Sequence, residues 1–144
     1  VCSSDLVTSE GVMEIDFVMD MDAFRSNNYD KVAAGIYSIV EAAEGRIVKV
    51  IIESCLWDDG QIETACEIVK EAKAQFVKTS TGFSNHGAMT QHVKLMRETV
   101  GDYFGVKASG GINTFLDAFA MIKAGANRIG TSSGIKIMRG SHVS

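Results

Sequence analysis

Val77–Phe83 reads VKTSTGF, and the same frame occurs twice more, as VKVIIES at 48–54 and VKASGGI at 106–112. The lysines of the three frames lie 29 residues apart at each step, at Lys49, Lys78 and Lys107. That spacing is the length of one strand followed by one helix, so the sequence predicts equivalent positions on neighbouring parallel strands. Such strands are covered on both faces and normally exclude lysine. Three lysines in register therefore require a chemical explanation.

Apolar runs alternate with helical patterns around these frames. The predicted strands cover 15–19, 47–52, 76–80, 106–109 and 128–130. The predicted helices cover 29–43, 58–74, 91–100 and 115–123, with Asp58 or Asp59, Thr90 and Thr114 as N-caps. Strict alternation of this kind predicts a parallel sheet with right-handed crossovers.

Two architectures fit the alternation, an open doubly wound sheet or a (β/α)₈ barrel. The similar length and chemistry of the units favour the barrel, which has eight strands and usually ~250 residues. Only five strands can be counted, so we expect residues 1–144 to form a single partial TIM-barrel domain, its C-terminal five-eighths. Residues 1–11 fit no later pattern and are expected to be a non-native or disordered start.

Composition excludes several classes of protein. A net charge of -4 gives no basic field for nucleic acid and no polybasic patch for a membrane surface. No apolar run approaches the ~18 residues of a membrane span. Three cysteines without CxxC spacing, namely Cys2, Cys55 and Cys66, favour a reduced cytoplasmic protein over one stabilised by disulfides.

Lys78 and Lys107 are expected side by side. Neighbouring strands lie ~4.8 Å apart, so two ammonium groups can approach within ~5 Å. At an effective dielectric constant of ~20 they repel by roughly 3 kcal/mol, which lowers one lysine pKa by about two units. Such a lysine can attack a carbonyl and form a Schiff base. The structural alternative is that both lysines reach solvent from strand ends or pair with carboxylates.

Lys49 shares the frame, and we expect it to pair with Asp16 or Glu53. Asp16 faces the same side as the lysines if Ile15 and Phe17 face the helices, and a carboxylate there is a suitable proton shuttle. The alternative is a buried ion pair without a catalytic task. Two further carboxylates, Asp20 and Asp22, are interpreted as solvated loop residues.

Glycine and hydroxyl residues follow three of the strands. These clusters are Thr79–Gly82, Ser109–Gly111 and Gly130–Gly134. Glycine lets backbone N–H groups approach an anion closely, and barrels commonly hold phosphate on the loops after their last two strands. Ordinary turn glycines are the alternative. Beside the lysines, the clusters favour a phosphorylated substrate.

Other reactive side chains carry less information. His86, His92 and His142 lack metal-ligand spacing. Cys66 belongs to an apolar helix stripe, and Trp57 is expected to pack where a strand ends. No GxSxG, Walker or GxGxxG motif is present.

From about Glu14 to Gly140 the sequence closely resembles the deoxyribose-phosphate aldolase family. The resemblance rests on EIDFV, VKVIIES, FVKTSTGF, GVKASGGI and RIGTSSG, in that order. It implies a class I aldolase on a TIM barrel that reversibly cleaves 2-deoxy-D-ribose 5-phosphate to D-glyceraldehyde 3-phosphate and acetaldehyde. It also implies a cytoplasmic enzyme of deoxyribonucleotide catabolism, without metal or organic cofactor, that can form homo-oligomers.

The resemblance also implies roles for individual residues. Lys78 matches the lysine that forms the Schiff base, Lys107 the lysine that perturbs it, and Asp16 the aspartate of the proton relay. Lys49 matches a lysine beside that aspartate. The residues expected to cradle the substrate phosphate are Gly82, Gly110, Gly111, Gly130, Ser132 and Ser133.

Two other functions remain open from the sequence. One is an inactive fragment that acts at most as a phosphosugar-binding module. The other is a phosphosugar barrel enzyme of the transaldolase or isomerase type.

Overall fold

The computed structural model describes residues 14–82 and 86–140, and within them five parallel strands form one sheet. The strands are β1 (Glu14–Val18), β2 (Ile47–Ile51), β3 (Phe76–Lys78), β4 (Gly105–Ser109) and β5 (Arg128–Gly130). Each predicted strand is confirmed, with ends that differ by at most two residues. The expectation about residues 1–11 lies outside the described part of the chain.

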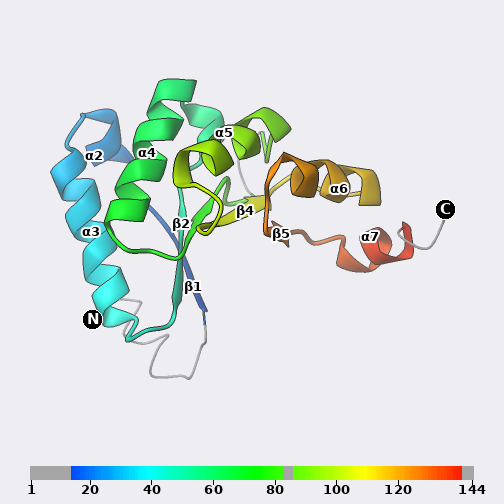
Figure 1. The fold of residues 1–144 in the computed structure, drawn as a ribbon, viewed down its shortest axis with the longest axis horizontal. Coiled ribbons are helices and arrows are strands. Elements are labelled where there is room, and N and C mark those ends of the chain that lie inside the picture. Colours follow the sequence, from blue (N-terminus) through cyan, green and yellow to red (C-terminus); the bar gives the residue numbers. More distant parts are fainter. Residues whose placement is uncertain (1–13, 83–85, 141–144) are drawn as a thin grey trace.

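The order of strands in the sheet is the order in the chain, β1-β2-β3-β4-β5. A doubly wound sheet reverses its strand order at a switch point, so this topology excludes that alternative. Successive right-handed crossovers in one direction place all helices on the same face, and Figure 1 shows the helices following one another around that face. The predicted partial (β/α)₈ barrel is confirmed as a five-stranded part of a barrel.

Seven helical segments accompany the strands in the described residues. They are α2 (Met21–Arg25), α3 (Tyr29–Ala42), the 3₁₀ turn η1 (Ser54–Leu56), α4 (Asp59–Glu71), α5 (Thr90–Val100), α6 (Phe115–Ala124) and α7 (Gly134–Gly140). The four long predicted helices are confirmed. The short segments α2, η1 and α7 were not predicted, because three to seven residues carry too little periodicity to indicate a helix.

Side-chain caps decide where most of these helices begin. Asp58 and Gln61 form a reciprocal capping box at α4, and Thr114 and Asp117 form another at α6. Thr90 was wrongly predicted as a cap. It is the first residue of α5, and the cap position is held by Met89, which makes no side-chain cap bond.

Asp20 is exposed, as expected for a solvated residue. Its carboxylate also accepts the backbone N–H of Ala23 at 2.9 Å and caps α2, a role that was not predicted. Asp22 lies in the first turn of the same helix and is exposed, as expected.

The core lies between the outer face of the sheet and the helices. Alternate strand residues point into it and are fully buried, namely Val48, Val50, Val77, Val106 and Ala108. They meet the apolar stripes of α4 and α5, which include Ile62, Cys66, Val69, Val93 and Met96. Trp57 packs edge-on against Phe24 with ring centroids 4.8 Å apart, and its indole N–H donates to the carbonyl of Ile52. The predicted core roles of Cys66 and Trp57 are confirmed.

The strand register tests the 29-residue lysine frame. Lys78 pairs directly with Lys107, as predicted, but Lys49 pairs with Phe76, while Lys78 lies opposite Ile51. The expectation that Lys49 occupies the equivalent position is therefore wrong by two residues. Strands in a closing barrel are staggered, and a stagger of two keeps the side chain on the same face.

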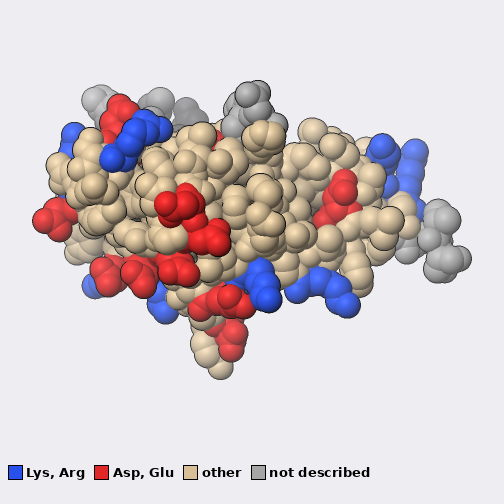
Figure 2. Space-filling view, turned by 90° about the horizontal axis from the view of Figure 1, so that it is seen from above, with Lys and Arg blue, Asp and Glu red and all other residues tan. Residues whose placement is uncertain are grey.

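The surface carries no cationic stripe on the face shown in Figure 2, where acidic and basic side chains are interspersed. Within the described ranges, no helix combines the length and the apolar character that crossing a bilayer requires.

A pair of glycine substitutions tests the packing on the concave inner face of the curved sheet, which we call the bowl. A Cβ at Gly105 would lie 2.4 Å from the Phe76 ring, whereas one at Gly35, in the helix α3, meets nothing within 4 Å. We expect Gly105→Ala to lower the free energy of unfolding by about 1–3 kcal/mol. Gly35→Ala should raise it by roughly 0.5–1 kcal/mol. Urea unfolding of both variants measures the difference, and equal effects would contradict this packing.

Candidate active site

The inner face of the sheet carries the charged residues. Ile15 and Phe17 on β1 pack toward the helices, so the alternate residue Asp16 points into the concave side. Lys49 on β2, Lys78 on β3 and Lys107 on β4 have the same orientation. Asp16 and the three lysines therefore lie on the inner face of the sheet, as predicted.

All three ammonium groups reach the carboxylate of Asp16. Lys78 Nζ and Lys107 Nζ each lie 3.0 Å from Asp16 Oδ2, and Lys49 Nζ lies 3.0 Å from Oδ1. The two lysines that share Oδ2 can be separated by no more than twice that distance. The predicted proximity of Lys78 and Lys107 is confirmed, with a carboxylate oxygen bridging them.

The charge state of Asp16 follows from these contacts. Partial burial by itself would raise the pKa of Asp16, but the hydrogen bonds from Lys107, Lys78 and Lys49 outweigh it. The pKa of this carboxyl is therefore held well below its usual range. Asp16 is an anion throughout the neutral range, and it partly neutralises two cations that would otherwise repel each other.

A second layer of charge lies below Asp16, toward the start of the strands. Glu14 Oε2 is 2.5 Å from Lys49 Nζ, and Arg128 Nη1 on β5 lies 2.7 and 2.8 Å from the two Glu14 oxygens. The hydrogen bond from Lys49, followed by that from Arg128, lowers the pKa of Glu14. The sequence reasoning missed both residues. Glu14 could have been found, because it precedes Asp16 by two positions and so shares its face.

Glu53 has a different partner from the one considered from the sequence. Its carboxylate accepts the hydroxyl of Thr81 at 3.0 Å, and Lys49 pairs with Asp16 and Glu14 instead. Glu53 is 7% exposed and holds a left-handed backbone with φ of 53°, where a side chain is strained. This contact fixes the loop that follows Lys78.

A cavity of about 420 Å³ opens where strands β3, β4 and β5 end. Its lining residues are Lys78, Thr81, Gly82, Ser109, Gly110, Gly111, Ile112, Gly130, Thr131 and Ser132. Five of the six residues expected to cradle phosphate therefore line one cavity together with Lys78. Thr81, Ser109 and Thr131 belong to the hydroxyl and glycine clusters found in the sequence, whereas Ile112 was not singled out.

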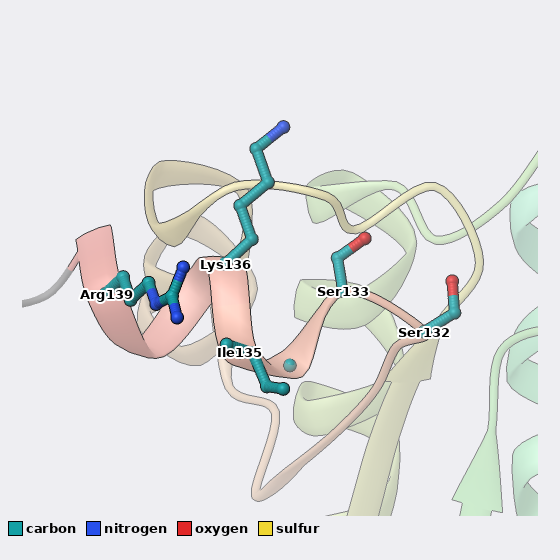
Figure 3. A pocket seen from close by; sticks show the side chains of 6 residues that line it. Ser132, Ser133, Ile135, Lys136 and Arg139 are labelled. Carbon is teal, nitrogen blue, oxygen red and sulfur yellow. The ribbon is translucent and has the colours of Figure 1, made fainter.

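Ser133 lies beside this cavity rather than in it. It lines an adjoining pocket of about 520 Å³ with Ser132, Gly134, Ile135, Lys136 and Arg139. Figure 3 shows Ser132 and Ser133 on the segment that leads into α7, with Lys136 and Arg139 on the helix itself. The backbone N–H of Ser133 donates to the hydroxyl of Thr131 at 2.9 Å.

Other reactive side chains stay apart from the cluster. Burial raises the pKa of the Cys66 thiol to about 12, so this thiol is inert at neutral pH. His92 is buried on α5, and His86 lies in a loop. His142 and Cys2 fall outside the described residues. No group of three potential metal-ligating side chains occurs within 14–82 and 86–140.

The family model and the most similar curated proteins are all aldolases. Residues 1–140 match the family described as DeoC/LacD family aldolase. The chain is 52% identical over 135 residues to a deoxyribose-phosphate aldolase of Streptococcus sanguinis, which covers 94% of the chain and 61% of that protein. It is 55% identical over 133 residues to one of Clostridium novyi, covering 92% of the chain and 60% of that protein. The chain thus spans about three fifths of these relatives.

Solved structures agree with the fold. An aldolase named QR15 superposes with a TM-score of 0.91 at 40% identity, over 94% of this chain and 62% of its own. The tetrameric deoxyribose phosphate aldolase of Aeropyrum pernix gives 0.88 at 34% identity, over 97% and 59%.

The lowered pKa of Asp16 predicts a pH-dependent contribution to stability. The pKa of Asp16 in the folded state lies below its ordinary value of 3.8, so the stabilisation is complete above that pH and is lost as the pH falls further. We expect Asp16→Asn to lower the free energy of unfolding by about 2 kcal/mol at pH 7. The gap between variant and wild type should narrow below pH ~4.

Urea unfolding between pH 7 and pH 2.5 measures this gap. Asp22→Asn is the matched control, because that carboxylate is 97% exposed and should change stability by less than ~0.5 kcal/mol. A gap for Asp16→Asn that stays constant down to the lowest pH would disprove the assignment.

Proposed function

The chain belongs to the DeoC/LacD family of aldolases, and from that premise we propose a Schiff-base cleavage of 2-deoxy-D-ribose 5-phosphate to D-glyceraldehyde 3-phosphate and acetaldehyde. One observation carries the proposal. Two lysines share a single oxygen of Asp16, and one of them also lines a glycine-rich cavity. A second cationic group beside a lysine is one of the arrangements that activate its amine for imine formation.

Lys78 is proposed as the nucleophile, because it is the lysine of the cluster that lines the cavity. Its uncharged amine attacks the aldehyde carbon of the open-chain sugar, and loss of water gives an iminium ion. The bond between C2 and C3 then breaks, with its electron pair retained on C2 as an enamine. The C3 hydroxyl loses its proton at the same time, so C3 becomes the aldehyde carbon of D-glyceraldehyde 3-phosphate, which leaves. Protonation of C2 and hydrolysis release acetaldehyde and the free amine.

Asp16 and Lys107 are proposed to move these protons. Asp16 contacts both lysines, so a proton leaving Lys78 has an acceptor network 3.0 Å away. Lys107 places a second amine at the Asp16 oxygen that Lys78 also contacts. Lys49, with a side chain only 3% exposed, is proposed to orient Asp16 and not to touch the substrate.

The phosphate group is proposed to lie at the glycine-rich end of the cavity. Gly110 and Gly111 have φ of 86° and 72°, a conformation that glycine adopts without strain. A backbone of that kind lets N–H groups face an anion. Gly82, Gly130 and Ser132 line the same cavity, and Ser133 lies next to it.

We further propose a cytoplasmic, homo-oligomeric protein of deoxyribonucleotide catabolism. Cys66 is a buried cysteine without a disulfide, which suits a reducing compartment. The tetramer described for the Aeropyrum pernix relative supports self-association. The proposed partners are the phosphorylated sugar and acetaldehyde, with no nucleic acid and no membrane.

Trapping the imine tests the proposed function. We expect acetaldehyde and borohydride to add a two-carbon adduct to Lys78, identified by peptide mass spectrometry. Lys78→Arg keeps the charge but cannot form an imine, so labelling and turnover should disappear. Lys107→Met should slow labelling by about 10²-fold, because the neighbouring cation is lost.

Lys94→Arg, at an exposed position on α5, is the matched control and should label normally. If the folded chain gave no adduct at Lys78, the aldolase mechanism would be rejected, and the alternative of a phosphosugar-binding module without catalysis would be favoured. If Lys78→Arg retained turnover, an isomerase-type reaction would replace the aldolase mechanism.

The phosphate site can be tested by placing a negative charge in it. Ser132→Asp should weaken binding of D-glyceraldehyde 3-phosphate at least ~10-fold, because the added carboxylate repels the phosphate. Ser38→Asp puts the same charge on the exposed face of α3 and should leave binding unchanged. NMR titration measures the dissociation constant of each variant. Equal constants for Ser132→Asp and Ser38→Asp would contradict the proposal that the phosphate binds in this cavity.

A further inference from the structure

We propose that Glu14 is a positioning residue that holds the guanidinium of Arg128 away from Asp16 and so leaves Asp16 Oδ2 to Lys78 and Lys107. The proposal deepens the proposed function, since it concerns the cluster assigned there to imine formation. It gives a role to two residues that the proposed mechanism does not use.

Arg128 begins at the same level as the lysines. Its Cα pairs in register with Lys107 on the neighbouring strand, and Gly130 is the next inner-face residue of β5. The side chain nevertheless turns toward the start of the strands and donates to both oxygens of Glu14, at 2.7 and 2.8 Å. A carboxylate on the far edge of the sheet thus determines where this cation rests.

Curvature of the sheet makes this contact possible. β1 and β5 are the outermost strands of the described sheet, and in a flat sheet they would lie ~19 Å apart. The ion pair joins the two edges of the sheet near the start of the strands, because the strands curl toward a barrel. The Phe76 ring packs against it, with its centroid 5.2 Å from the Arg128 guanidinium carbon. The absence of a side chain at Gly105 leaves room for that ring.

Asp16 is an alternative partner for Arg128 on the inner face of β1. It follows Glu14 by two residues on the same face, which is a step of ~7 Å along the strand. Guanidinium binds carboxylate in strong charge-assisted pairs, more rigidly than ammonium does. Without the Glu14 carboxylate, Arg128 would therefore compete with Lys78 and Lys107 for Asp16 Oδ2.

Glu14 also contacts Lys49, which lies between the Glu14 carboxylate and the Asp16 carboxylate. Lys49 bonds Glu14 Oε2 and Asp16 Oδ1, so it occupies the Asp16 oxygen that faces Glu14. The charged groups around Glu14 are then Lys49 and Arg128, and those around Asp16 are the three lysines. Each carboxylate has its own set of cations, and only Lys49 is shared.

Lysine acetylation tests the proposal without requiring imine chemistry. A brief pulse of acetic anhydride modifies uncharged, unbonded amines, and peptide mass spectrometry gives the rate at each lysine. In Glu14→Gln, Arg128 should displace the lysines, so acetylation of Lys78 and Lys107 should rise at least about fivefold. The exposed Lys31 and Lys94 provide the reference rate.

Arg128→Met is the matched control, because it breaks the same ion pair but removes the competing guanidinium. It should leave both acetylation rates within about twofold of the unaltered chain. The double variant Glu14→Gln/Arg128→Met should return to the same low rates. If Glu14→Gln fails to fold alone, the double variant decides, since it must fold and show the low rates.

Three results would overturn the proposal: unchanged rates in Glu14→Gln, an equal rise in Arg128→Met, or a double variant no lower than Glu14→Gln. Acetaldehyde trapping on the same variants separates this question from the proposed function. Failure of trapping at Lys78 in the unaltered chain rejects the aldolase reaction, while the acetylation rates still report on Glu14. If trapping occurs, its pH profile should change in Glu14→Gln and recover in the double variant.

Discussion

The shared oxygen of Asp16 is the contact on which the rest of the site depends. Two ammonium groups lie 3.0 Å from it, an arrangement that requires strands β1, β3 and β4 to converge on one point. Neighbouring strands alone bring Lys78 and Lys107 together, but β1 is two strands removed from β3. The curvature of the sheet brings Asp16 on β1 close to the lysines of β3 and β4. The cluster can therefore form only in a curved sheet.

The fold limits the cost of burying these charges in two ways. It separates the charged inner face of the sheet from the apolar outer face, and it divides the inner charges into two layers. Valine and alanine on the outer face of the sheet are buried under α4 and α5, while every charged strand residue points inward. Within the bowl, Glu14 with Arg128 forms a lower layer, and Asp16 with Lys78 and Lys107 an upper one. Each buried cation has a carboxylate within hydrogen-bond distance, as partly desolvated charges require.

Much of this arrangement could be predicted from the sequence. Alternation along the strands gave the face of Asp16 and the lysines, and the capping residues Asp58 and Thr114 gave the starts of α4 and α6. The two-residue offset of Lys49 could not be predicted, because a repeat spacing does not contain the stagger between strands. Arg128 was missed for a related reason: its partner lies 114 residues away and comes within reach only in the curved sheet. The short helices α2 and α7 lack the periodicity that indicates a helix.

The strand order has a consequence for how the chain folds. Each strand pairs with its neighbours in sequence, so the sheet can grow one unit at a time through contacts of modest sequence separation. The links from Asp16 to Lys107 and from Glu14 to Arg128 span 91 and 114 residues, so they close much larger loops than the strand pairs do. The reactive cluster is therefore complete only when β1, β2, β3 and β4 are all in place.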